Sequence, residues 1–273
     1  MQFGRWEKKL TRLIAKILIS CSFFAAAVAC QAAMDPIPCA VGNHWELDCV
    51  KLMKGKIEYK GQNVANMFDT SSGTVLYDVL AVDNAATPVY SYRETTRVRS
   101  SIRGRETTEK SEMRITNDAK ALKILSTESS FTDDGKSDKQ SYDPPLFYFA
   151  KDAAPGKSWD VGTIRGESSS EPLSAKAVNR ESVTVPAGTF KDCLKVVYTS
   201  DTATGTIDML GQTFTVLSGK TRSVYWIAEG IGVVKELEVS TSTAQSPGPA
   251  GGFVTLEAST CTINELKPGY IVK

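Results

Sequence analysis

The fold is indicated most clearly by a stretch in the second half of the chain, residues 183–196, which reads VTVPAGTFKDCLKV. Pro186 presets φ for a turn, and Gly188 two residues later can adopt a left-handed conformation. Phe190 opens the run that follows, in which apolar and polar residues alternate as they do along a half-buried strand. The stretch therefore predicts a β-hairpin.

A second stretch, residues 225–235, reads YWIAEGIGVVK and has the same organisation. Trp226 belongs to the apolar run before the reversal, and Gly230 and Gly232 stand at the reversal itself. Glycine is the residue that most readily supplies the positive φ that a tight turn needs. This stretch predicts another β-hairpin.

Segments of the same kind, rich in Val, Thr, Tyr and Ile, recur from residue 40 onward between clusters of Gly, Pro, Asn and Asp. The pattern is typical of antiparallel sheets. We predict a mostly β fold, a single antiparallel curved sheet that forms an incomplete barrel or sandwich with few short helices. The predicted strands are 45–50, 57–59, 74–82, 89–99, 105–115, 121–131, 158–165, 175–185, 193–199, 205–210, 212–217, 222–227, 232–239 and 253–258.

Some segments between these strands have their own local signals. Residues 62–69 fit two helical turns, and residues 117–125 fit either a helix or a strand. Turns are expected at 133–135 and 143–145, where Asp, Pro and Gly cluster. The polar, Pro- and Gly-rich residues 241–252 are expected to form a mobile hairpin loop.

The mature chain is predicted to be one β-rich domain, residues 30–273, with an echo of two similar halves that meet near 143–156. Residues 41–45, VGNHW, and residues 155–159, PGKSW, each place a Gly-led turn before a tryptophan. We expect Trp45 to fill part of the core where the first half begins.

Residues 1–29 have the organisation of an export signal. Five basic residues, the last of them Lys16, precede the uncharged stretch 17–29, which ends in small residues. At 13 residues this stretch is shorter than the roughly 20 that a membrane-spanning helix needs. Cleavage is expected after Ala29 or after Ala32. As a third alternative, Ala27-Val28-Ala29-Cys30 looks like a bacterial lipobox, in which Cys30 becomes the acylated first residue.

The balance of charge argues against nucleic acid as a partner. The whole chain carries 32 basic and 31 acidic residues, and removal of 1–29 takes away five basic residues and one acid, leaving 27 and 30. The mature chain is therefore slightly acidic and offers no basic field for a polyanion. Membrane contact is expected only through the lipid anchor of the third alternative.

Six cysteines occur, of which Cys21 leaves with the signal. If Cys30 is acylated or also removed, an even set of four remains, which an oxidising compartment would pair into two disulfides. The connectivity stays open. The local choice joins Cys39 to Cys49, and Cys193 then pairs with Cys261.

The sequence offers no catalytic, metal-binding or cofactor-binding motif. Residues 156–158, GKS, lack the earlier glycine of a phosphate-binding loop, and no Gly-x-Ser-x-Gly is present. His44 is the only histidine and is expected to be a surface or packing residue, so neither a zinc site nor a catalytic couple is predicted.

Charged residues cluster in two places without a clear site. Arg97, Arg99, Arg103 and Arg105 are interleaved with or adjacent to Glu94, Glu106, Glu109 and Glu112, which favours a charged solvent face on a long hairpin. Glu236 and Glu238 share one strand face, and solvent is their expected environment. A hydrolase would need two inward-facing acids in a cleft, and no pair can be singled out from the sequence.

The two hairpin stretches, together with residues 41–45, resemble uncharacterised β-rich bacterial envelope proteins, periplasmic or lipoprotein, that carry a VPAGTF…CLKV…YWxAxGxGxVK pattern. The resemblance covers chiefly residues 155–240. Such proteins are similar in architecture to lipoprotein carriers of the Lol type, although the scarcity of helices departs from the carriers. The resemblance implies a concave, apolar face that receives an acyl chain or a hydrophobic peptide.

These observations lead to three functional hypotheses. The first is a non-enzymatic, exported envelope protein, periplasmic or at the outer membrane, that binds a hydrophobic ligand or a partner protein. The second is a structural or interaction protein of the cell surface whose aromatic residues are simply core. The third is a hydrolase that uses carboxylates from distant segments. A filled interior would favour the second hypothesis, and paired acids inside a cleft would favour the third.

Overall fold

The computed structural model describes residues 35–83, 87–102, 104, 106–131, 137–165, 170–202, 205–209, 212–248 and 251–273. The predicted signal 1–29 and the lipidation candidate Cys30 lie outside the described residues. The same is true of Arg103, Arg105 and the expected turn at 133–135.

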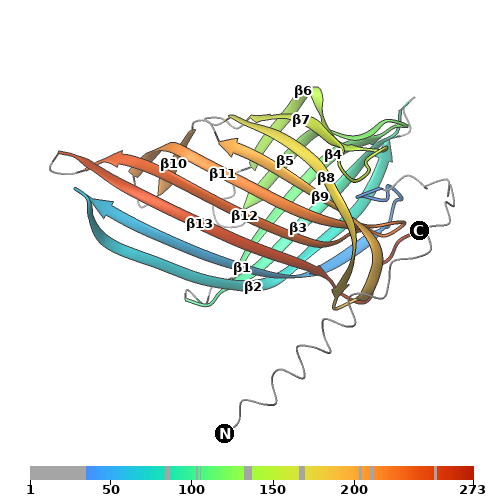
Figure 1. Ribbon diagram of the computed structural model, residues 1–273, viewed down its shortest axis with the longest axis horizontal. Coiled ribbons are helices and arrows are strands. Elements are labelled where there is room, and N and C mark those ends of the chain that lie inside the picture. The colour runs from blue at the N-terminus through green and yellow to red at the C-terminus, as the bar shows by residue number, and fades with distance from the viewer. Residues whose placement is uncertain are drawn as a thin grey trace, which may run out of the picture. The chain divides into compact units, whose positions relative to one another are not determined.

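The described residues form mostly β-strands and contain no helix (Figure 1). The strands are β1 (His44–Tyr59), β2 (Gln62–Asp83), β3 (Val89–Ser100), β4 (Glu106–Asn117), β5 (Ala121–Phe131), β6 (Ser137–Ala150), β7 (Ser158–Arg165), β8 (Ser170–Val185), β9 (Gly188–Thr202), β10 (Gly205–Met209), β11 (Gln212–Ala228), β12 (Gly232–Pro247) and β13 (Phe253–Leu266).

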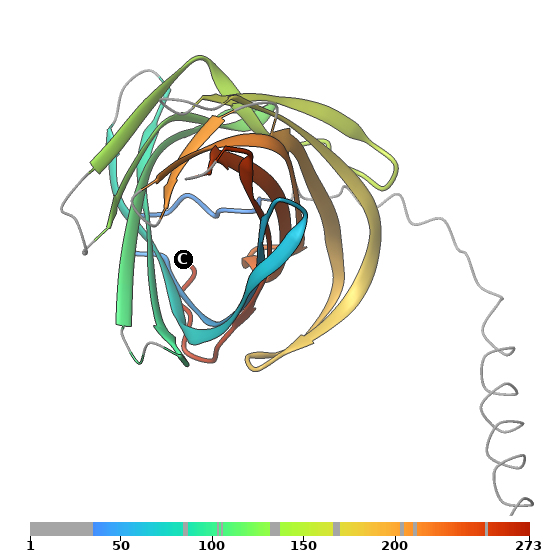
Figure 2. The same ribbon diagram turned by 90° about the vertical axis from the view of Figure 1, so that its left-hand side faces the viewer.

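All strands belong to one antiparallel sheet, in the order β6-β5-β4-β3-β2-β1-β13-β12-β11-β9-β8-β7, with β10 paired to β11. The sheet curls around a lumen, so that its two end strands, β6 and β7, approach each other (Figure 2). They are joined by side-chain contacts, such as the indole of Trp159, which donates to the Tyr148 carbonyl oxygen at 3.2 Å. The predicted single curved sheet is confirmed, and its form is a nearly closed barrel with one seam.

Several local predictions are wrong. Residues 62–69 are the first part of β2 and pair with β1 rather than forming helical turns. For residues 117–125 the strand alternative holds, since they contain the end of β4, a turn at Asp118 and the start of β5, whose bounds match the predicted strand 121–131. Residues 143–145 lie within β6 rather than in a turn, and residues 241–247 continue β12. Backbone pairing along the neighbouring strand outweighs local propensity in these segments.

The two hairpins that open the sequence argument are formed. Val185 pairs with Gly188 across the Pro186-Ala187 turn, and Gly188 has φ of 131°. Ala228 pairs with Gly232 in the second hairpin. A Cβ atom at Gly232 would lie 2.8 Å from the carbonyl oxygen of Pro36, so the residue is required for close approach as well as for its positive φ.

The aromatic residues of these motifs pack into the wall. Trp45 is buried and donates its indole N–H to the Ile231 carbonyl oxygen at 2.8 Å. Trp226 donates to Glu181 at 2.5 Å, and Phe190 lies against Tyr270 with ring centroids 6.4 Å apart. Hydrogen bonds from Trp226, Asn179 and Lys195 lower the pKa of Glu181 to about 2.

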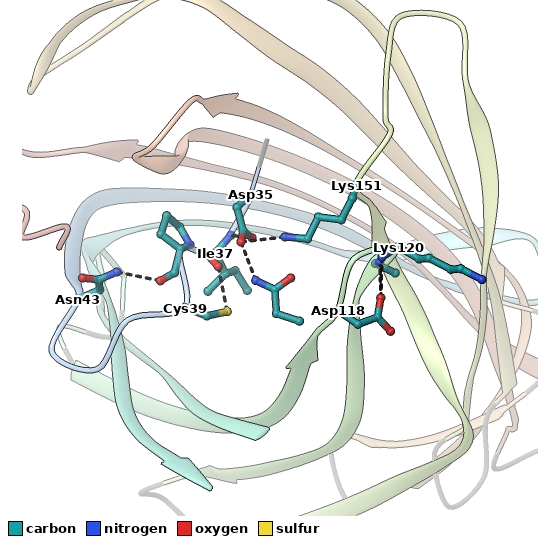
Figure 3. A network of polar contacts seen from close by, with 10 residues as sticks. Asp35, Ile37, Cys39, Asn43, Asp118, Lys120 and Lys151 are labelled. Atoms are coloured by element: carbon teal, nitrogen blue, oxygen red, sulfur yellow. Dashed lines mark hydrogen bonds and ion pairs between the residues drawn. The ribbon is translucent and has the colours of Figure 1, made fainter. Parts of the chain in front are cut away.

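One end of the barrel is closed by the segment that precedes β1, which crosses the lumen (Figures 2 and 3). Asp35 accepts hydrogen bonds from Asn117 at 2.7 Å and from Lys151 at 2.9 Å, beside β4 and β6. The Pro36 carbonyl accepts from the backbone of β12, and Ile37 is buried in the main core cluster. We call residues 35–43 the plug.

Candidate functional site

A cavity of ≈ 770 Å³ lies inside the barrel above the plug. Its volume falls within the usual range of small-molecule sites, about 300–1,000 Å³. Apolar and aromatic side chains predominate near the plug, and polar ones lie farther along the strands. The lining residues that the argument uses are Ile37, Lys51, Val75, Tyr77, Tyr92, Glu94, Thr96, Glu109, Met113, Ile115, Ile124, Tyr148, Tyr225, Val233, Glu236, Glu238, Thr262 and Asn264.

The strand register explains why these residues meet. Along β1, residues 45, 47, 49 and 51 face inward, and their cross-strand partners on β13 and β12 share that face. Tyr225, Glu236, Asn264 and Cys49 consequently form one row across β11, β12, β13 and β1. On the other wall, Tyr77 of β2 lies directly opposite Glu94 of β3.

Glu236 is the most enclosed acid of this site, with 8% of its surface exposed. The side-chain amide of Asn264 donates to its carboxyl at 2.9 Å, and the hydroxyls of Tyr225 and Tyr77 are hydrogen-bonded to it as well. Burial nevertheless raises the pKa of Glu236, because these donors offset only part of the lost hydration.

Glu94 is the second inward-facing acid. The Thr96 hydroxyl donates to its carboxyl at 3.2 Å. Burial, together with the nearby Glu236, raises the pKa of Glu94 to about 8. The two carboxyls thus interact electrostatically across the lumen, and no basic side chain among the described residues forms an ion pair with either of them.

The cavity becomes more polar away from the plug. Lys51, Glu238 and Thr262 lie one inward-facing position farther along β1, β12 and β13 than the row that contains Glu236. Glu109 of β4 is exposed at this end, and burial of part of its side chain raises its pKa against the opposing effect of Lys51. The cavity therefore has an apolar floor, an acidic and aromatic middle and a charged mouth.

The expectation that solvent surrounds these acids is wrong for Glu236 and for Glu94. Glu236 and Glu238 do share a face, but it is the inward face, and Glu236 is buried. Glu94 also points inward, whereas Arg97 and Arg99 on the same strand are exposed. The pleat of β3 separates these two sets of charges.

His44 lies outside the cavity, half-buried, with its Nδ1 atom 2.7 Å from Asp78. No group of three His, Cys, Asp or Glu side chains in the described part of the chain is arranged to hold a metal ion. Among the described residues no helix is long and apolar enough to cross a membrane.

The predicted disulfides are not formed, because Cys39, Cys49, Cys193 and Cys261 are all free thiols. Cys193 lies in β9 and Cys261 in β13, with β11 and β12 between them. Three strand spacings amount to about 14 Å, twice the Cα separation that a disulfide can span. Cys39 donates to the Ile37 carbonyl within the plug, and burial raises the pKa of its thiol to about 12.

Comparison with known proteins gives limited matches. Residues 158–240, from the start of β7 into β12, match the model of the DUF3108-like family. This is the stretch on which the resemblance to bacterial envelope proteins chiefly rests. A solved structure from Parabacteroides distasonis ATCC 8503, provisionally assigned as a lipoprotein, is 16% identical with a TM-score of 0.31, covering 87% of this chain and 100% of that chain. None of the curated proteins compared with the chain matches it.

Proposed function

We propose that the protein is an exported envelope protein that binds an amphiphilic small molecule inside the barrel, without catalysing a reaction on it. The proposal rests on the ≈ 770 Å³ cavity. A purely structural protein would gain stability by filling such a space, because empty volume in a core is costly. The plug closes the apolar end, so a ligand would enter from the end near Lys51 and Glu109.

The character of the lining supports a ligand with an apolar part. Val75 and Ile115 are almost completely buried in the wall, and Ile37 and Ile124 complete the floor. Hydrocarbon placed against this floor gains roughly 25 cal/mol for each Å² removed from water. The resemblance that the sequence motifs imply to Lol-type carriers is in line with the same proposal by analogy of architecture.

Ligand binding is tested with the neutral fluorescent probe N-phenyl-1-naphthylamine. The native protein should enhance and saturate its fluorescence. Met113→Trp, which places a larger side chain in the cavity, should weaken binding at least about tenfold. Val50→Trp on the outer face of β1, where Val50 is 43% exposed, is the matched control and should bind as the native protein does. Equal binding by both variants would place the probe outside the barrel and contradict the proposal.

Export and lipidation are tested by the intact mass of the mature protein, reduced and unreduced. Cleavage after Ala29 or Ala32, or acylation at Cys30, gives three distinct masses. Retention of residues 1–29 would contradict the proposed envelope location. Native mass spectrometry of protein purified from its own membrane fraction should also show a co-purified lipid.

A carboxylate-dependent hydrolase is the second candidate, and the inward-facing pair Glu94 and Glu236 favours it. Such enzymes need one protonated and one ionised carboxyl. Burial raises the pKa of both acids here, while the donors around Glu236 partly counteract the effect. Turnover of p-nitrophenyl esters or glycosides that is abolished by both Glu94→Gln and Glu236→Gln would support this candidate over simple binding.

A further inference from the structure

Aromatic rings line the cavity at the level of the two acids. Tyr77 and Tyr92 come from the neighbouring strands β2 and β3, whereas Tyr148 of β6 and Tyr225 of β11 come from other parts of the sheet. Tyr77 is stacked on Tyr92 with centroids 5.6 Å apart. Tyr198, behind the lining, stacks on Tyr148 and contacts Tyr225 edge-on. These contacts fix the orientation of the rings.

The charged residues that line the cavity are mostly acidic. Four glutamates border the cavity, and Lys51 is the one basic residue among the described lining residues. Lys51 lies toward the mouth, beyond the row that contains Glu236. At the level of Glu94 and Glu236 the described residues therefore provide hydrogen-bond donors but no compensating positive charge.

Asn264 adds an observation that is independent of the acids. Its residue is 6% exposed, it borders the cavity, and its amide nitrogen donates to Glu236. Its Oδ1 atom has no hydrogen-bond partner. Buried acceptors are normally paired, so an unpaired oxygen on a residue that contacts the Glu236 carboxyl favours a missing donor at this level of the barrel.

The nature of that donor follows from the surroundings. A second anion would be repelled by the two acids, and a purely apolar chain would leave their desolvation unrelieved. A cationic nitrogen is attracted by a carboxylate and by the faces of tyrosine rings, and both attractions strengthen out of water. The combination of aromatic rings with enclosed carboxyls is therefore complementary to an ammonium group.

We propose that the occupant of the cavity carries a protonated amine, which lies between Glu94 and Glu236 among the lining tyrosines and can donate to the Asn264 Oδ1 atom, while its apolar part contacts the floor. The inference rests on the proposed function and specifies its ligand as a cationic amphiphile.

The test compares ligands that share a twelve-carbon chain and differ in the head group. Dodecyltrimethylammonium, dodecylamine, dodecyl maltoside and dodecyl sulfate are titrated into the full chain by calorimetry at pH 8.5, below their critical micelle concentrations. Far-UV circular dichroism checks that the barrel stays folded throughout. Dodecylamine should bind about tenfold or more tightly than the maltoside, and the sulfate should bind most weakly. Tighter binding of dodecyltrimethylammonium than of dodecylamine would contradict the hydrogen-bond donor assigned to the nitrogen, because the trimethylammonium group has no N–H.

Two variants separate the head-group site from the cavity as a whole. Glu94→Gln and Glu236→Gln should each weaken binding of the cations about tenfold and leave the maltoside unchanged. Glu106→Gln, an exposed position on β4, is the control. Equal affinity for all head groups, or tightest binding of the sulfate, would overturn the cationic site while leaving the proposed function intact. Failure of all four ligands, and of the naphthylamine probe, would overturn both.

Discussion

Replacement of Glu94 by glutamine should make the ligand-free protein more stable at alkaline pH. The ordinary pKa of this glutamate is 4.5, and the fold raises it to about 8. Each unit of pKa difference corresponds to about 1.4 kcal/mol, so complete ionisation of Glu94 costs roughly 5 kcal/mol of folding free energy. Glu94→Gln preserves the shape of the side chain and removes that cost.

The direction of this pH dependence follows from proton binding to Glu94. Between pH 4.5 and about 8 the folded protein holds the Glu94 proton while the unfolded chain has lost it. The free energy of unfolding therefore falls as pH rises through this window, by at most about 1.4 kcal/mol per pH unit. Glu236, whose pKa is also raised, contributes in the same direction and remains in the variant. The other titratable groups that line the cavity with Glu94 also remain, namely Cys49, Lys51, Tyr77, Tyr92, Glu109, Tyr148, Tyr225 and Glu238.

Urea unfolding followed by circular dichroism at pH 5, 7 and 9 measures the effect. At pH 5 the variant and the native protein should agree within about 1 kcal/mol, and at pH 9 the variant should be more stable by several kcal/mol. Glu106→Gln should leave the native profile unchanged, since Glu106 is exposed. Parallel profiles for the native protein and Glu94→Gln would show that Glu94 ionises freely, which would refute its enclosure in the barrel.

Three further predictions concern the wall and the plug. Gly73→Ala should destabilise the protein by about 3 kcal/mol in urea unfolding, because its Cβ would lie 1.8 Å from the Arg97 carbonyl oxygen, whereas Ser72→Ala on the exposed face should change stability by less than about 0.5 kcal/mol. The pKa of Glu181 is lowered to about 2, so its ionised form stabilises the fold above pH 4.5 and this stabilisation is lost as pH falls toward 2. Glu181→Gln should reduce the loss of thermal stability between pH 4.5 and 2 by about 1 kcal/mol. The effect is small because the side chain is 36% exposed. Asp35→Asn removes the partly buried ion pair of the plug and should increase amide hydrogen exchange across residues 36–43, and unchanged exchange there would show that the ion pair does not hold the plug.

The parts of the fold that sequence predicts well are those with explicit turn chemistry. Pro186 and Gly188, or Gly230 and Gly232, leave few alternatives to a tight reversal, and the strands they join are found. Strand β6 was missed because its Asp143-Pro144-Pro145 run has the composition of a turn. As an end strand of the sheet, β6 tolerates prolines that a central strand would exclude.

The long strands were predicted too short for a related reason. Sequence patterns detect a strand by burial on one face, and the far ends of β1 and β2 extend past the main core. Val64 and Phe68 are 59% and 54% exposed although they lie in β2. Within residues 62–69 only Met67 packs against the second apolar cluster, so alternation is weak and the segment retained a pattern that fitted a helix equally well.

The acids of the site escaped prediction because inward polar and outward polar residues look alike in a barrel with an open lumen. On β3 a signal was present, since Tyr92 and Val98 share the face of Glu94 and point to the interior. On β12 the hydrophobic pattern indicates the wrong face as the inner one. Leu237 and Val239 lie on the outer face, opposite to Glu236, so the more apolar face of this segment is the one that faces away from the cavity.

The cost of the enclosed acids connects stability with binding. Roughly 5 kcal/mol for ionising Glu94 is comparable to the whole folding free energy of a typical domain, about 5–15 kcal/mol. A ligand at one hundred times its dissociation constant stabilises the folded state by about 2.7 kcal/mol. A cation that pairs with the carboxylate must also displace its proton where Glu94 is protonated, so its stabilising effect has to grow with pH up to about 8. A neutral occupant that leaves the protonation of Glu94 unchanged has no such linkage, and the pH dependence of ligand-induced stability therefore reports on the charge of the occupant independently of its affinity.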